Sequence, residues 1–244
     1  MPELPEVETI KRQLGKKIIG KSLQGKKIAA VRRRAKILII DFADGSSLIF
    51  HLKMTGQLIF NGKPSPYTRK VFIFDDNSKM IFNDARKFGW WKQVKTAKEI
   101  EKQFGPECLE IDFKSFKTGL KKHGRSKIKT LLMDQKVIAG IGNIYSDEIL
   151  FAAKIHPLRL VSGLNEREMG RIFNQMKRIL LRAVEDKGSS VEYYLDACGE
   201  KGSYAKKHKV YQKEKQKCPR CSKRIEKIKI GGRTARFCPG CQAI

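Results

Sequence analysis

The chain begins Met1-Pro2-Glu3-Leu4-Pro5-Glu6-Val7-Glu8, a short acidic stretch at the start of a heavily basic protein. Proline in a first helical turn and acids near the positive end of the helix dipole both favour a helix that starts here. The same stretch also permits catalytic chemistry, because removal of Met1 would leave Pro2 with a free secondary amine. An α-amino group titrates near pH ~8, and burial beside cations lowers its pKa further.

A neutral amine of this kind can attack an electrophilic carbon and form a Schiff base. Glu3, the next residue, would then be placed as a general acid or base. The eight residues alone leave the helix start and the amine nucleophile as open alternatives.

Composition indicates a polyanionic partner. The 244 residues include 52 Lys and Arg against 25 Asp and Glu, a formal net charge of +27. Such an excess favours binding to phosphate backbones, although ribosomal and membrane-surface proteins share it. No apolar run approaches the ~20 residues of a membrane span, and the N-terminus has no signal-peptide pattern. We therefore expect a soluble, cytoplasmic protein without membrane contact. We also expect it to be nucleoid-associated and monomeric, which composition by itself does not determine.

Four of the six cysteines have the spacing Cys218-x2-Cys221-x16-Cys238-x2-Cys241, which predicts one structural Zn²⁺ held by four thiolates. Residues 225–230 and 233–237 flank Gly231-Gly232 and predict a β-hairpin with the cysteine pairs at its base and Arg233 at its tip. Cys108 and Cys198 are isolated, and we expect both to be reduced.

Residues 28 to 94 contain short β-like runs separated by turns. The runs 36–40 and 47–52 flank Ala43-Asp44-Gly45, and the runs 71–74 and 80–82 flank a second turn at 75–78. Two local hairpins imply antiparallel sheets, which pack naturally as two layers. The fold class predicted is α+β, with an amphipathic N-terminal helix over residues 7–18 on a two-layer antiparallel β-sandwich.

The following segment, as far as about residue 195, has a helical pattern. Asn165 and Glu168 resemble a capping box before one apolar stripe. Two shorter helices, 127–135 and 143–154, surround Ala139-Gly140-Ile141-Gly142, with Asn143 expected as the N-cap. Backbone N–H groups at such a turn can meet a phosphate, but a helix–helix turn without a ligand is equally consistent. The predicted domains are 1–110, 111–210 and 211–244.

Six ordered motifs together resemble the formamidopyrimidine-DNA glycosylases of the Fpg/Nei family. They cover essentially the whole chain: Met1–Glu8; Arg34-Ala35-Lys36; His51-Leu-Lys-Met54-Thr-Gly56; Asp84-Ala-Arg86-Lys-Phe88-Gly89; Lys129 to Asn143 and on to Pro157; and the last 27 residues with Gly232-Arg233. The resemblance implies a helix–two-turn–helix domain over 111–210 and a zinc-finger hairpin over 211–244.

The resemblance also implies the function and the site residues. The family excises oxidised purines, 8-oxoguanine and formamidopyrimidines, from damaged double-stranded DNA and then cleaves the strand by β,δ-elimination. Pro2 and Glu3 would be catalytic, with Lys36 and Arg233 as proton donors or phosphate anchors. Residues expected to contact DNA are Met54, Lys70, Arg86, Phe88, Lys129 and Asn143. A base-extruding enzyme needs such groups to fill the hole and wedge the stack.

The chain departs from the family pattern at several points. The stretch 25–31 is shorter than usual, and a phosphate-contacting histidine of many relatives corresponds to Lys70, which can bind phosphate as a point charge. The loop near Ser203 and Tyr204 is divergent, which leaves lesion choice open. Two alternatives remain. An endonuclease VIII-like specificity for oxidised pyrimidines is disfavoured by Leu4 and by Arg34-Ala35-Lys36, and a non-catalytic zinc-finger protein is disfavoured by Pro2 and Glu3.

Overall fold

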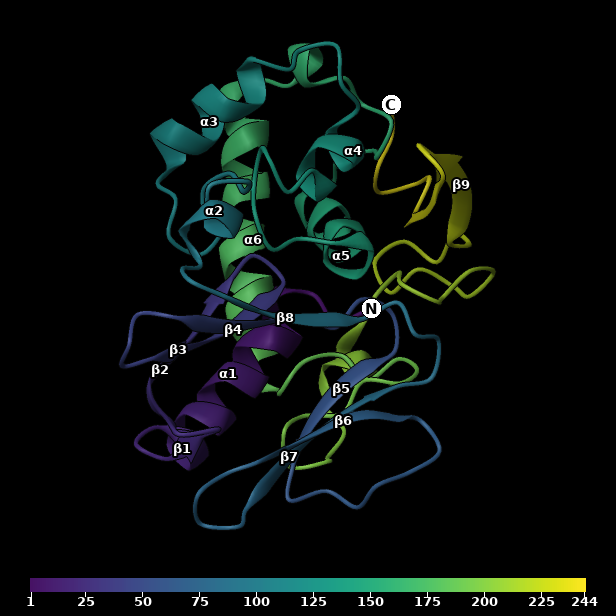
Figure 1. Cartoon of the computed structure of the whole chain (residues 1–244). Coiled ribbons are helices and arrows are strands. Elements are labelled where there is room, and N and C mark those ends of the chain that lie inside the picture. Colours follow the sequence, from purple (N-terminus) through teal and green to yellow (C-terminus); the bar gives the residue numbers. More distant parts are fainter. The chain divides into compact units, whose positions relative to one another are not determined.

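The computed structural model describes residues 1–244, and its contacts divide the chain into two units (Figure 1). The first unit comprises Met1–Gln103 and Ala183–Ala205, and the second comprises Phe104–Arg182 and Lys206–Ile244. The predicted three-domain division stays a prediction. Residues 183–205 make most of their contacts with the N-terminal unit and therefore belong to it, although in the sequence they come directly after the helical segment of the second unit.

The first unit begins with helix α1, Leu4–Ile18. Its buried residues Val7, Ile10, Leu14 and Ile18 recur every three or four positions, so they form one apolar stripe. The helix starts three residues before the predicted Val7, because Pro5 fits the first turn, where its missing N–H is not needed.

A five-stranded antiparallel sheet follows, with the order β1-β2-β3-β4-β8. Its strands are β1 (Ser22–Leu23), β2 (Lys26–Arg34), β3 (Ile37–Phe42), β4 (Ser47–His51) and β8 (Trp90–Val94). Strands β3 and β4 pair from Ile37 opposite His51 to Asp41 opposite Ser47, and the turn between them contains Gly45 with φ +82°. The first predicted hairpin is confirmed.

The second sheet has three strands in the order β5-β7-β6. They are β5 (Gly56–Phe60), β6 (Thr68–Ile73) and β7 (Lys79–Asp84), and a short helix α2 (Lys98–Glu101) lies beyond β8. Val71 pairs with Ile81 and Phe72 with Met80, which confirms the second predicted hairpin.

The two sheets share one hydrophobic core with α1. The ring of Phe50, in the first sheet, lies 5.5 Å from that of Phe72 and 6.1 Å from that of Phe82, both in the second sheet. Tyr194 and Ala197 belong to the same core, which explains why segment 183–205 groups with this unit. The predicted two-layer sandwich is confirmed.

The second unit is mainly helical. Its elements are α3 (Phe113–Lys121), α4 (Ile128–Met133), α5 (Asn143–Ala153), the 3-10 turn η1 (Val161–Gly163), α6 (Glu166–Glu185), whose last turn belongs to the first unit, the 3-10 turn η2 (Tyr204–Lys207), β9 (Glu226–Ile230) and β10 (Arg233–Phe237). The Asn165–Glu168 capping box is present, with both N–H···O distances at 2.9 Å.

One predicted detail of this unit is wrong. Gly142, not Asn143, is the N-cap of α5, and Asn143 is the first helical residue. Gly142 has extended φ and ψ angles of −131° and −155°, so the chain enters the helix one residue earlier than the asparagine signal suggested.

Candidate functional site

The N-terminal residues are held inside the first unit. Pro2 is buried and Glu3 is 1 % exposed, while Met1 is partly exposed. Glu3 occupies the N-cap position of α1, where its backbone N–H donates to the Glu6 carboxylate at 2.7 Å. In the chain as printed the Pro2 nitrogen is part of an amide bond, so an amine at this position requires removal of Met1.

Glu6 connects this N-terminus to a segment far along the chain. Its second oxygen accepts the backbone N–H of Ser189 at 2.7 Å, and both residues are buried. A Cβ on Gly188 would lie 2.8 Å from that oxygen, and Gly188 has φ +82°, so only glycine fits without strain. The Glu6 carboxylate therefore fixes the position of the first residues against the 188–189 turn.

Lys36 lies at the turn between β2 and β3. It is 7 % exposed, and the preceding Ala35 is fully buried with φ +53°, an uncommon conformation for a residue with a Cβ. Arg33 donates to the Ala35 carbonyl at 2.9 Å and to Glu8 of α1 at 3.1 Å. Arg33 therefore connects the turn before β3 to α1 through hydrogen bonds, and these bonds help to fix the orientation of Lys36.

The histidine opposite the start of β3 is neutral at physiological pH. Burial, together with the charges of Lys53 and Lys36, lowers the pKa of His51 to about 4. Its Nδ1 accepts the backbone N–H of Lys53 at 3.1 Å. Neutral His51 adds no positive charge beside Lys36 and fixes the start of the loop that carries Met54.

One buried carboxylate organises the two loops that carry Met54, Arg86 and Phe88, three of the residues predicted to contact DNA. Asp84 is 1 % exposed and accepts the hydroxyl of Thr55, the N–H of Gly89 at 2.6 Å and the N–H of Arg86 at 3.2 Å. The Thr55 hydroxyl also accepts the Arg86 N–H at 3.1 Å. Met54, Arg86 and the residues up to Gly89 are therefore ordered by a single acid.

The side chains presented by these loops are accessible. Phe88 is 55 % exposed and the Arg86 guanidinium lies 4.8 Å from its ring centre, a cation–π contact. Met54 is half-buried. Lys70 lies on strand β6 and not on these loops, and its ammonium is 5.6 Å from the ring centre of Trp91. An aromatic ring this exposed costs solvation energy in the free protein, which favours a role in contact with a ligand.

In the second unit, Gln135 shapes the glycine-containing turn before α5. Its amide donates to the carbonyls of Met133 at 2.9 Å and Ile141 at 2.8 Å, and its oxygen accepts the N–H of Gly140 at 2.9 Å. Asn143 follows this turn, and its Oδ1 atom is buried without a hydrogen-bond partner. An amide oxygen without a partner at the start of a helix is suited to an arriving ligand, since rotation of the amide can bring its N–H donors to the same place.

The predicted DNA contact of Lys129 does not fit its position. Lys129 is 1 % exposed, and its ammonium donates to Asp147 at 2.5 Å and to Ser146 at 3.1 Å. Burial raises the pKa of Asp147 to about 7 in spite of this opposite charge. Lys129 therefore joins α4 to α5, and its effect on DNA binding would be indirect.

The four clustered cysteines meet the requirements of a zinc site. All four sulfur atoms lie within 4.8 Å of one another, with Cys218 and Cys241 3.8 Å apart and Cys221 and Cys238 3.3 Å apart. Zn–S bonds of about 2.3 Å in a tetrahedron place sulfurs about 3.8 Å apart, so the arrangement fits one ion. Four protein ligands leave no open position, which makes the site structural.

Hydrogen bonds connect the zinc hairpin, and the segment before it, to α5 and to the residues that follow α5. Gln242, fully buried, accepts the N–H of Cys238 at 2.9 Å and donates to the Ile155 carbonyl at 2.8 Å. The Glu148 carboxylate accepts the three successive N–H groups of residues 209–211, at 2.9 to 3.1 Å. Strands β9 and β10 pair as predicted, and Arg233 is exposed at the tip beside Gly232.

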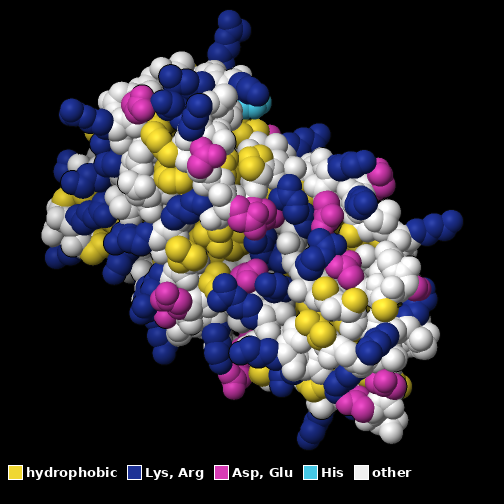
Figure 2. Space-filling view, turned by 90° about the vertical axis from the view of Figure 1, so that its left-hand side faces the viewer, with side chains coloured by type: hydrophobic (Ala, Val, Ile, Leu, Met, Phe, Trp, Pro, Cys, Tyr) yellow, Lys and Arg dark blue, Asp and Glu magenta, His cyan; other side chains and the backbone are white.

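The surface charge is consistent with a polyanionic partner. Lys and Arg side chains are spread over the face shown in Figure 2, and Asp and Glu occur there in smaller numbers. No helix of the structure is long and apolar enough to cross a membrane.

Comparison with known families accounts for most of the chain. Residues 17–91 match the formamidopyrimidine-DNA glycosylase N-terminal domain, 104–194 its H2TH domain, and 215–244 a zinc finger found in FPG and IleRS. The formamidopyrimidine-DNA glycosylase of Listeria innocua is 39 % identical over 99 % of this chain and 100 % of its own length. That of Carboxydothermus hydrogenoformans is 38 % identical over the same shares.

Solved structures give the same result. The Lactococcus lactis Fpg in complex with DNA containing an abasic site superposes with a TM-score of 0.91, at 34 % identity and full coverage of both chains. MutM (Fpg) from Thermus thermophilus gives 0.91 at 36 % identity, over 99 % of this chain and 98 % of that one. Fold and motifs together define a DNA glycosylase with a helix–two-turn–helix domain and a zinc finger. Within that class, the chain belongs to the formamidopyrimidine-DNA glycosylase family.

Several residues that organise the site were not predicted from the sequence. Glu6 was interpreted only as a dipole-favouring acid, and Asp84, Gln135 and Glu148 had no assigned role. Each accepts or donates several hydrogen bonds while buried or half-buried. A usable signal existed for Glu148, which directly precedes Ile149-Leu150-Phe151, since an acid beside an apolar run seldom stays buried without partners.

Proposed function

We propose that this chain is a bifunctional DNA glycosylase and abasic-site lyase that removes 8-oxoguanine and formamidopyrimidines from duplex DNA as a monomer. The observation that carries the proposal is the pairing of buried Pro2 with buried Glu3 at a chain end fixed by Glu6. Damaged DNA as the substrate is supported by the relatives, one of which was solved with DNA containing an abasic site.

In the proposed reaction the Pro2 amine attacks the sugar C1′ atom. A carbon–nitrogen bond forms, the glycosidic bond breaks, and the base leaves with that bond's electron pair and takes up a proton. The Pro2 nitrogen then loses its N–H proton to the departing base or to water. As the C1′–O4′ bond breaks, Glu3 donates a proton to O4′ and the nitrogen lone pair forms the C=N bond of an iminium ion. Proximity and burial favour both roles, since each reacting group is held within a water-poor environment.

The iminium then makes the adjacent C2′–H acidic. Loss of that proton expels the 3′ phosphate (β-elimination), and a second elimination expels the 5′ phosphate (δ-elimination). We propose that Lys36 and Arg233 donate protons or anchor phosphates during these steps. Zinc, when bound, supplies folding energy to the hairpin that carries Arg233.

Recognition of the extruded nucleotide is assigned to the residues of these two loops. Phe88 would wedge the stack, Met54 would fill the vacated space, and Arg86 would hold the orphaned base. Lys70 and Asn143 would bind phosphates, the latter through the N–H donors of its amide at the start of α5, once the amide has rotated.

The test is a comparison of lesion duplexes under single-turnover conditions. We expect excision of 8-oxoguanine and formamidopyrimidine with phosphates left on both sides of the gap, and slower excision of oxidised pyrimidines. Preferred excision of oxidised pyrimidines would instead support the endonuclease VIII-like specificity. Excision without strand cleavage would refute the proposed lyase step.

A further inference from the structure

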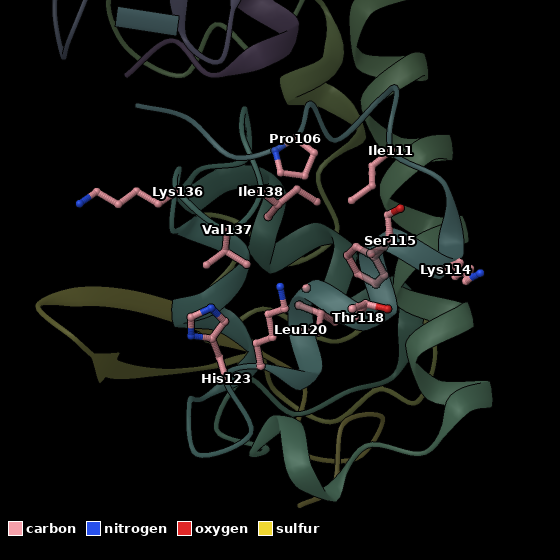
Figure 3. Close-up of a pocket in the computed structure, with 13 residues that line it drawn as sticks. Pro106, Ile111, Lys114, Ser115, Thr118, Leu120, His123, Lys136, Val137 and Ile138 are labelled. Carbon is pink, nitrogen blue, oxygen red and sulfur yellow. The ribbon is translucent and has the colours of Figure 1, made fainter. Parts of the chain in front are cut away.

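The second unit contains a cavity that shares no residue with the zinc site or with any predicted DNA contact. Its volume is about 610 Å³, and it lies between helix α3, the segment near Pro106 and residues 136–138 (Figure 3). This volume falls within the ~300–1,000 Å³ typical of ligand pockets.

The floor of the cavity is apolar. Ile111, Phe116, Leu120 and Ile138 are all buried at 8 % exposure or less, and Val137 adds a half-buried side chain. All three of Val137, Ile138 and Leu120 line the cavity, and Figure 3 shows Leu120 below the other two. A large apolar side chain placed here would contact these residues and remove the apolar atoms of the lining that are still exposed from water.

The rim of the cavity is cationic. Lys114, Lys122 and Lys136 line it and are exposed, and none of their ammonium groups has a described ion pair. In Figure 3, Lys114 and Lys136 extend on opposite sides of the hollow. By contrast, Lys117 on the same helix pairs with Glu166 at 2.9 Å. The rim therefore has positive charge that no neighbouring carboxylate neutralises.

The acids closest in sequence to Lys114 and Lys136 already accept hydrogen bonds from backbone N–H groups. Asp112 caps α3 by accepting the N–H of Ser115 at 2.8 Å, and Asp134 accepts the N–H of Lys136 at 2.9 Å. Neither carboxylate has a described contact with a rim ammonium, so carboxylates from another molecule would meet three available cations.

We propose that this cavity binds an acidic peptide segment of a partner protein through a large apolar side chain, with flanking carboxylates on the three lysines. A DNA strand would satisfy the lysines but would leave the apolar floor without a matching group. Charge complementarity on the rim and a buried apolar floor together favour the peptide.

The chain offers a matched pair of variants for the floor. Gly119 lines the cavity within α3, and a Cβ added to it meets no atom within 4 Å. Gly119→Leu should therefore fill part of the cavity without disturbing the helix, and Gly119→Ala should leave room for a ligand. Both residues favour a helix over glycine, so neither variant should unfold α3.

A second matched pair addresses the rim. Lys122 lines the cavity, whereas its neighbour Lys121 is also exposed but does not line it. Lys122→Glu and Lys121→Glu change the net charge identically. Any difference between them therefore reports on the cavity rather than on the overall charge of the protein.

The experiment measures binding of a labelled acidic peptide containing phenylalanine to the full chain by fluorescence anisotropy. We expect affinity to fall about tenfold or more for Gly119→Leu and Lys122→Glu, and little for Gly119→Ala and Lys121→Glu. Equal losses for both lysine variants, or equal binding of a peptide with serine in place of phenylalanine, would overturn the proposal. A labelled single-stranded oligonucleotide that follows the same variant pattern and displaces the peptide would overturn it in favour of nucleic acid.

Discussion

At the scale of single residues, the first six positions contain two acids with different tasks. Glu6 uses both carboxylate oxygens to hold backbone N–H groups of Glu3 and Ser189, so it has a positioning role. Glu3 lies beside Pro2 and is nearly inaccessible to water, so it is the carboxyl suited to proton transfer.

Glu3→Gln should separate the two halves of the proposed reaction. An abasic sugar has already lost its base and can open spontaneously, so it needs the acid less than an intact lesion does. Because general acid–base catalysis contributes roughly 10²–10⁴ in rate, we expect excision of 8-oxoguanine to fall by about that factor. Cleavage at a preformed abasic site should remain measurable in single-turnover assays. Equal losses on both substrates would remove the role assigned to Glu3.

Arg86→Ala should affect the choice of opposite base more than strand cleavage. Arg86 is exposed on the loop that Asp84 organises, and its guanidinium stacks on Phe88. Without it, we expect the rates of 8-oxoguanine excision opposite each of the four bases to become more similar. Lys87→Ala, at the next exposed position, is the matched control. An unchanged base preference in Arg86→Ala would contradict the assignment.

His51 should make stability dependent on pH. Its pKa is lowered in the folded state to about 4, from an unperturbed 6.5. The unfolded state therefore binds more protons between these values, and stability falls as pH decreases from about 6.5 toward 4. His51→Gln should reduce that fall in urea denaturation at successive pH values, whereas His123→Gln, at an exposed position, should not. An identical pH dependence in all three proteins would show that His51 is not buried as a neutral ring.

At the scale of elements, short sequence patterns correctly predicted the hairpins and the helix cap, which depend on residues close together in the sequence. Both β-hairpins, the Asn165–Glu168 capping box and the zinc hairpin follow from turn residues and spacing within short windows. The start of α5 was misplaced by one residue, because Asn143 is a strong cap signal and Gly142 a weak one.

Long-range pairings could not be predicted in this way. The Glu6–Ser189 bond joins residues 183 positions apart, and nothing in either local sequence indicates the partner. Lys129 was expected to contact DNA because of the motif resemblance, and only the position of Asp147 on α5 explains why its side chain is buried. The candidate site residues were predicted mainly from the motif resemblance. The acids that position them could be recognised only from their hydrogen bonds in the structure.

The zinc hairpin should lose its structure when one ligand is removed. Cys238 is fully buried among the other three sulfurs, and zinc binding is coupled to folding of such hairpins. We expect Cys238→Ala to lose both stoichiometric zinc in elemental analysis and duplex DNA affinity in gel-shift titrations. Cys198→Ala, an exposed cysteine outside the cluster, should retain both. Full DNA affinity in a zinc-free Cys238→Ala protein would show that the hairpin folds without metal.

At the scale of the whole molecule, the chain combines a β-sandwich that carries Pro2 and Glu3 with a helical unit that carries the zinc hairpin. The formal charge of +27 is large enough that DNA affinity should depend steeply on salt, so activity comparisons need a fixed ionic strength. Charge explains attraction to DNA, but it does not distinguish an enzyme from a binding protein.

Borohydride trapping makes that distinction and tests the central claim directly. The protein, with loss of Met1 verified by mass spectrometry, is incubated with a duplex containing an abasic site and treated with borohydride, and the cross-linked peptide is sequenced. A Schiff base on Pro2 predicts a covalent complex whose DNA adduct maps to the N-terminal proline, and no complex when Met1 is retained. A robust adduct on a lysine, or trapping by protein with intact Met1, would contradict the account.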